Sequence, residues 1–189
     1  MKWTAKAGAN FGAGMRMRNN HLIHRAAFRG DWQMKLRREG QIIWEVEYKN
    51  IITNEGLNHI LDVELSGATQ VTTWYIGLVS GATPTFAAAD VMNSHAGWTE
   101  FTSYSEANRV TWVDNGVSSQ SVSNSGGNVA TFTMSGGGTI GGAFLVSENT
   151  KGGTTGVLYA EGDFATDRTV VTSDVLEVTA TFSSADDGA

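Results

Sequence analysis

Short runs of alternating apolar and polar residues recur from residue 69 onward, and turn-forming residues separate them. Gly, Ser and Asn gather between the runs, at 114–116, 125–127, 136–138 and 151–153. Many short strands with a turn signal every eight to twelve residues or so are typical of antiparallel sheets packed as a sandwich or jelly roll. The sequence therefore predicts a mainly all-β fold, an antiparallel β-sandwich or jelly-roll-like body. The expected strands within 69–183 are 72–79, 98–104, 109–113, 118–122, 129–134, 140–146, 157–159 and 175–182.

A β-hairpin is expected at residues 32–48, ahead of those strands. Two alternating runs flank the short turn Glu39-Gly40, which is the pattern of a hairpin. One face of the second run is expected to carry Ile42, Trp44, Val46 and Tyr48. The opposite faces would bring two basic residues near two acidic ones across the strands, namely Lys35 and Arg37 near Glu45 and Glu47.

One short helix is expected at residues 54–65. Thr53 or Asn54 can cap its first turn, and Glu55 places an acid near the positive end of the helix dipole. An i, i+3, i+4 apolar spacing follows and predicts the buried face of the helix. The residues of that face are Leu57, Ile60, Leu61 and Leu65. A single helical turn at 87–92 is also compatible with the sequence.

The basic residues are concentrated at one end of the chain. Ten of the thirteen Lys and Arg residues lie in the first 49 positions, and residues 1–30 hold six of them without any acid. No helical or strand period persists there, so we expect an extended basic N-terminal arm at 1–30 and a β-sandwich body at 31–189. The arm residues expected to bind a partner are Trp3, Arg16, Arg18, Arg25, Arg29 and Trp32. Two alternatives stay open: a tail that orders on nothing, and tryptophans that pack on the chain's own body.

Several kinds of site are excluded or weakly supported by the sequence. The chain has no cysteine, so it has neither a disulfide nor a thiolate ligand. No apolar run approaches the length of a membrane span, and no Sec signal peptide is indicated. The histidines (His21, His24, His59 and His95) stand without evident metal or triad partners. Glu100 and Glu106 can be named as a carboxylate pair for glycoside hydrolysis, but nothing singles them out. We therefore expect no cofactor, no metal and no enzymatic activity.

Several motifs in the body occur together in a recognisable order. They read NIITNEGLN at 50–58, TWYIGL at 73–78, SHAGWTE at 94–100, YSEA at 104–107, GAFLVS at 142–147 and TKGGTTG at 150–156. These motifs, in this order, resemble those of a family of small structural proteins of tailed bacteriophages, over roughly residues 32–183. The resemblance implies a virion component without catalytic residues. Residues 1–30 lie outside it.

The function expected from these features is structural. A capsid decoration or cement protein would sit on the head, and its arm would bind the major capsid protein or other virion subunits, with many copies per particle. The location implied is the virion, assembled in the host cytoplasm. A tail or neck component (adaptor, tip or fibre base) stays open as the alternative, with loops 80–97 or 147–156 facing the host. A basic arm also suits nucleic acid, but residues 50–189 carry three basic residues against fifteen acids, which opposes it.

Overall fold

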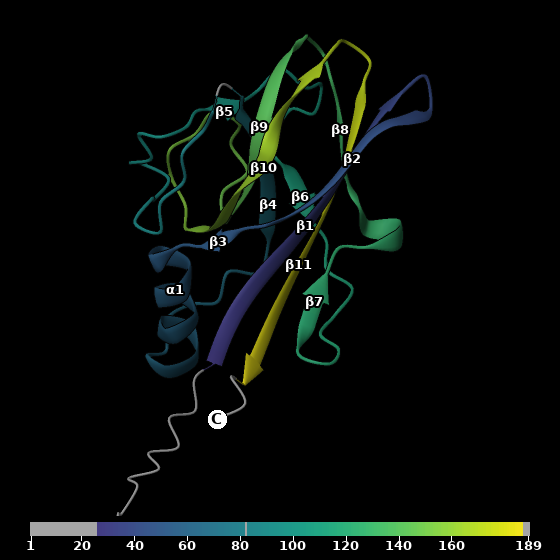
Figure 1. Ribbon diagram of the computed structural model, residues 1–189. Coiled ribbons are helices and arrows are strands. Elements are labelled where there is room, and N and C mark those ends of the chain that lie inside the picture. Colours follow the sequence, from purple (N-terminus) through teal and green to yellow (C-terminus); the bar gives the residue numbers. More distant parts are fainter. Residues whose placement is uncertain (1–25, 82, 187–189) are drawn as a thin grey trace, which may run out of the picture.

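Two antiparallel sheets packed face to face form the body in the computed structural model, which describes residues 26–81 and 83–186 (Figure 1). The five-stranded sheet has the order β2-β1-β11-β7, and β8 also pairs with β11. Its strands are β1 Ala26–Arg38, β2 Gln41–Lys49, β7 Ser121–Ser123, β8 Ala130–Thr133 and β11 Val175–Asp186. The six-stranded sheet has the order β3-β10-β9-β4-β5, and β6 also pairs with β4. Its strands are β3 Ile51–Ile52, β4 Trp74–Ser80, β5 Glu100–Phe101, β6 Val110–Trp112, β9 Gly138–Val146 and β10 Leu158–Val170.

This architecture confirms the all-β prediction. The strand orders do not confirm the jelly-roll arrangement, which was the other form of that prediction. The last strand, β11, pairs with the first, β1, along its length, from Ala26 opposite Asp186 to Arg37 opposite Val175. The two ends of the described chain therefore lie side by side at one end of the body (Figure 1).

The core lies between the sheets and is built by strand alternation. In β1, Trp32, Met34 and Leu36 are buried, whereas the residues between them face outward. Trp32 stacks on Tyr48 of β2, with ring centroids 6.1 Å apart, and meets Phe182 of β11 edge-on at 6.2 Å. Each such fully buried large side chain stabilises the fold by about 1.5–3 kcal/mol.

The predicted hairpin at 32–48 is present as β1 and β2. Glu39 and Gly40 both have positive φ, at 50° and 79°, which matches the tight turn that hairpin strands favour. Lys35 and Glu45 form the predicted ion pair at 3.3 Å. Arg37 instead pairs with Glu177 of β11 at 2.7 Å. The β1–β2 register shifts between Leu36 and Arg37 and places Arg37 opposite Ile42, and the expected contact of Arg37 with the β2 acids does not form. Ile42, which was expected on the face of Trp44, lies beyond this shift and is 45% exposed.

The first strand begins earlier than the sequence indicates. β1 starts at Ala26, so residues 26–30, which were expected in the arm, belong to the sheet and pair with β11. Gly30 occupies an inward position opposite Phe182, which removes the apolar side chain that would have revealed the alternation.

The helix α1, Asn54–Leu65, has the predicted bounds and is the one α-helix of residues 26–81 and 83–186. Thr53 is its N-cap: the Thr53 hydroxyl accepts a hydrogen bond from the Gly56 amide at 2.9 Å and donates one to the Leu158 carbonyl. The predicted apolar face is wrong in part. Leu57 and Ile60 are half-buried, but Leu61 is 55% and Leu65 is 80% exposed.

Two further segments differ from the expectation. The run predicted as a strand at 157–159 belongs to β10, which continues to residue 170. Its pairing with β9 is interrupted after Asp163 and resumes at Arg168, and this irregularity hides the second half of the strand from an alternation pattern. Residues 87–92 form no helical turn. They contain a reverse turn in which the Asp90 amide donates to the Ala87 carbonyl at 2.9 Å.

Gly56 is where α1 approaches the six-stranded sheet most closely. A Cβ atom added at Gly56 would lie 2.4 Å from the Tyr159 carbonyl oxygen. Gly56→Ala should therefore lower the free energy of unfolding by about 1–3 kcal/mol, although alanine favours helices. Urea unfolding followed by tryptophan fluorescence measures this. Asn58→Ala, on the exposed side of α1, is the control, and equal stability of the two variants would contradict the close approach.

Candidate functional site

The residues predicted to bind a partner are divided by the structure. Trp3, Arg16, Arg18 and Arg25 lie outside the described residues. Arg29 is exposed on β1, opposite Ser183. Trp32 is only 1% exposed and belongs to the core, so its predicted role as an anchor in a partner's pocket is wrong. Strand alternation explains this, because Trp32 has the same parity as Met34 and Leu36 and points between the sheets.

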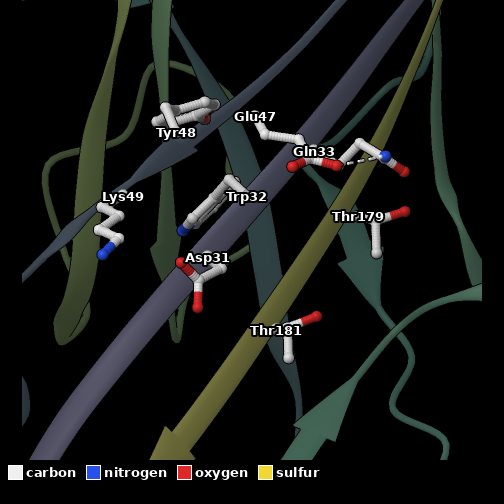
Figure 2. A pocket seen from close by; sticks show the side chains of 8 residues that line it. All are labelled: Asp31, Trp32, Gln33, Glu47, Tyr48, Lys49, Thr179 and Thr181. Carbon is white, nitrogen blue, oxygen red and sulfur yellow. Dashed lines mark hydrogen bonds between the residues drawn. The ribbon is translucent and has the colours of Figure 1, made fainter.

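An open groove crosses the outer face of the five-stranded sheet. Figure 2 shows its lining residues on β2, β1 and β11, and the groove encloses about 410 Å³. The lining residues are Asp31, Trp32, Gln33, Glu47, Tyr48, Lys49, Thr179 and Thr181. Gln33 donates to Glu47 at 3.0 Å across the strands. The mixed carboxylate, ammonium, amide and hydroxyl groups suit polar contacts with another surface.

Glu100, one of the two carboxylates considered for glycoside hydrolysis, is bound inside the protein. Arg109 is 2% exposed and donates to both Glu100 oxygens, at 3.0 and 2.8 Å. The same guanidinium donates to the carbonyls of Glu148 at 2.9 Å and Gly153 at 2.7 Å. The Gly152 amide adds a bond to Glu100 at 2.9 Å. This cluster fastens the 147–153 loop to the end of β5.

Glu106, the second of those carboxylates, has a similar use. Both of its oxygens accept from the Thr133 amide, at 3.0 and 3.2 Å. Lys151 binds the same loop by donating to the carbonyls of Tyr104 at 2.8 Å and Glu106 at 2.6 Å. Its ammonium also lies 4.1 Å from the centre of the Tyr104 ring. Glu100 and Glu106 therefore hold loops to the sandwich.

Glu161 on β10 is a buried carboxyl group that the sequence pattern does not reveal. Glu161 is fully buried and accepts hydrogen bonds from the Trp98 indole at 2.9 Å and the Ala87 amide at 3.1 Å. Burial raises the pKa of Glu161 to about 8. The negative charge of Asp90 and a hydrogen bond with Asp90 add to this shift. A raised pKa can mark a catalytic acid. Here the carboxyl is enclosed and holds the 84–98 loop against the six-stranded sheet.

The two described histidines are packing residues. The His95 ring stacks on Trp98, with centroids 3.8 Å apart, and its Nδ1 lies 3.1 Å from the Trp98 carbonyl oxygen. His59 of α1 meets Trp74 edge-on at 5.6 Å. His21 and His24 lie outside the described residues. Within the part of the chain that the structure describes, no group of three His, Asp or Glu residues is placed to hold a metal ion.

The body's basic side chains are largely used for internal contacts. Residues 26–186 carry eight Lys and Arg residues against eighteen Asp and Glu residues. Lys35, Arg37, Arg38 and Arg109 form ion pairs with carboxylates. Arg168 lies over the Trp44 ring, at 5.9 Å. The unbalanced charge of the body is therefore acidic, whereas residues 1–25 hold five basic residues and no acid.

The Arg109 cluster gives a prediction about stability. Arg109→Ala leaves Glu100 buried without its ion partner, so it should lower the free energy of unfolding by about 3–5 kcal/mol. Arg37→Ala removes a partly exposed pair with Glu177 that solvent screens, so it should cost much less. Chemical unfolding of both variants measures the difference. Similar losses would show that Arg109 is not the central contact of these loops.

Glu161 gives a prediction about pH. Its folded pKa is about 8, above the ordinary 4.5, so the folded protein holds a proton that the unfolded chain releases. The stability from this group is complete below about pH 4.5 and falls by about 1.4 kcal/mol per pH unit until about pH 8.

Glu161→Gln keeps a neutral side chain in place and should remove that part of the pH dependence. Urea unfolding at pH 5 and pH 8 measures the slope for both proteins. Glu64→Gln, at an exposed position on α1, is the control and should keep the wild-type slope. Equal slopes for wild type and Glu161→Gln would contradict the assignment of the retained proton to Glu161.

In the described residues, no helix is both long and apolar enough to cross a membrane. No known family model matches the chain, and no curated protein matches it either.

Proposed function

We propose that this protein is a structural subunit of a tailed-bacteriophage particle, a capsid decoration or cement protein rather than an enzyme. The observation that carries the proposal is the separation of charge between the two parts of the chain. The body has ten more acidic than basic residues over 26–186, whereas residues 1–25 hold five basic residues and no acid. An acidic body and a basic arm on the same chain suit repeated contacts between subunits.

The form of the body supports this role. The two packed sheets present an outer face that includes a groove bordered by Asp31, Glu47 and Lys49. Buried ion pairs and carboxylates hold the long loops to the sandwich. A firm body is useful on a particle surface, where each contact is weak and many symmetry-related contacts act together. The partners in this proposal are the major capsid protein and other copies of this chain.

The fastened loops also favour a second function, in the tail or neck of the particle. The 84–98 and 147–153 loops are held by Glu161 and Arg109, so they present fixed surfaces to a receptor or ring partner. Copy number in purified particles separates the two roles. A number comparable with that of the capsid protein supports decoration, and a number equal to the symmetry of one tail ring supports the alternative.

The position at which β1 begins defines the deletion that tests the arm. A chain lacking residues 1–25 keeps every strand pairing, so its thermal unfolding should match wild type while it is lost from assembled particles. A chain lacking residues 1–30 also loses the first β1–β11 pairs and Phe28, so its melting temperature should fall. Calorimetry and quantification of particle-bound protein measure both effects. Normal incorporation of the shorter deletion would overturn the role of the arm.

A further inference from the structure

The solvent side of α1 carries an apolar strip. Leu61 is 55% and Leu65 is 80% exposed. Because residues four apart lie one above the other on a helix, these two side chains form one continuous patch. The sheet does not need them, since α1 docks through Gly56 and the half-buried Leu57 and Ile60.

Acidic residues border this strip on both sides. At 100° per residue, Asp62 and Glu64 project on opposite sides of the Leu61–Leu65 line, and both are exposed. They lie in the last two turns of the helix. The C-terminal end of the helix dipole is negative, so acidic residues near it destabilise the helix. α1 has no basic residue in its last turn, and no Lys or Arg elsewhere in its sequence. The strip therefore has an uncompensated negative border.

A depression beside this border can receive a cation. It encloses about 470 Å³ between α1 and the loop at Ala89 and Val91. Its α1 side is lined by Asn54, Glu55, Asn58, His59 and Asp62. Carboxylates next to amide and carbonyl oxygens suit the planar guanidinium of arginine, which donates several hydrogen bonds at once.

The residues outside the structure include a segment of matching chemistry. The sequence Met15-Arg16-Met17-Arg18 alternates flexible apolar side chains with long cations. Methionine adapts well to irregular apolar surfaces such as two leucines on a helix. Arginine can bury its aliphatic stem along such a surface while its head reaches a carboxylate at the border.

We propose that the solvent face of α1, defined as Leu61, Asp62, Glu64 and Leu65, binds the Met15–Arg18 segment of a neighbouring copy. The final turn of α1 lies at the same end of the body as Ala26, where β1 begins (Figure 1). Seven residues lie between Arg18 and Ala26, and the eight Cα–Cα steps can span up to about 28 Å, enough to reach a body in direct contact. The segment and the α1 face are different surfaces, so copies that each bind the next one in turn are linked head-to-tail into a ring or a filament.

That the Met15–Arg18 segment binds α1 of a neighbouring copy rests on the proposed function, because a segment bound to α1 of its own chain would not link two subunits. The chemistry of the α1 face does not rest on it. The two parts of the proposal can therefore fail separately, and the experiment distinguishes them.

The absence of native cysteine allows a direct test in the full chain. Copies with Met17→Cys and one affinity tag are mixed with copies carrying Leu65→Cys and another tag, under oxidising conditions. Disulfide-linked pairs of the two tagged chains should form roughly tenfold faster than with Val171→Cys as the second chain. Val171 is a matched control, being an exposed apolar residue (43%) outside α1.

Charge reversal adds a second measurement. Arg16→Glu with Arg18→Glu in the Met17→Cys copies should bring cross-linking down to the Val171→Cys level. Asp62→Lys with Glu64→Lys in the Leu65→Cys copies should restore it, because the charges are then exchanged. Cross-linking that is equal at positions 65 and 171, or insensitive to charge reversal, would overturn the proposed face.

A chain with both Met17→Cys and Leu65→Cys separates contact within one copy from contact between copies. Bonds formed only within a chain would overturn the neighbouring-copy assignment. If arm deletion abolishes incorporation but no 17–65 bond forms, the proposed function stands and the α1 contact falls. If the bond forms and the deleted chain is still incorporated, the proposed function falls and the α1 contact stands.

Discussion

The pairing of β1 with β11 is the constraint on which the rest of the structure depends. It joins the two ends of the described chain in one continuous antiparallel ladder. β1 brings β2 to one side of this ladder, and β11 brings β7 and β8 to the other. The inner faces of the same strands supply Trp32, Met34, Val178 and Phe182 to the core. Because the partners are about 140 to 160 residues apart in sequence, the ladder forms only when the intervening chain is in place.

Buried charged side chains hold the loops in place where the regular strands end. The six-stranded sheet has short outer strands and long connections, and hydrogen bonds from carboxylates and arginines hold those connections in position. Arg109 and Glu161 each bind backbone groups from a loop distant in sequence. The Asp174 carboxylate accepts from the Val171 amide within its own turn and from the side chain of the distant Arg38, whose hydrogen bond lowers the pKa of Asp174. Such groups stabilise only as complete clusters, because removing one member leaves its partner buried and unpaired.

The sequence reveals local structure well and distant pairing poorly. The bounds of α1 and the hairpin turn at Glu39-Gly40 follow from cap and turn chemistry within a few residues. The partner of Arg37 could not be predicted, because β11 lies 140 residues away and nothing local favours it over β2. The pairing of Glu100 with Arg109 was not predicted either, although the two residues are only nine positions apart in sequence. The face of α1 was misjudged because periodicity locates apolar residues without showing which side meets the sheet. The groove and the buried charged clusters can be located only from the structure, whereas the positive charge of residues 1–25 is evident from the sequence.

The central position of β1 has a mechanical consequence. β1 lies between β2 and β11 and is hydrogen-bonded to both. A pull on Ala26 along the axis of β1 therefore loads both ladders in shear, so many hydrogen bonds resist together instead of opening one after another. An edge strand would share the load with one neighbour only. Tension that reached the body through residues 1–25 would thus enter at the most firmly held strand of its sheet.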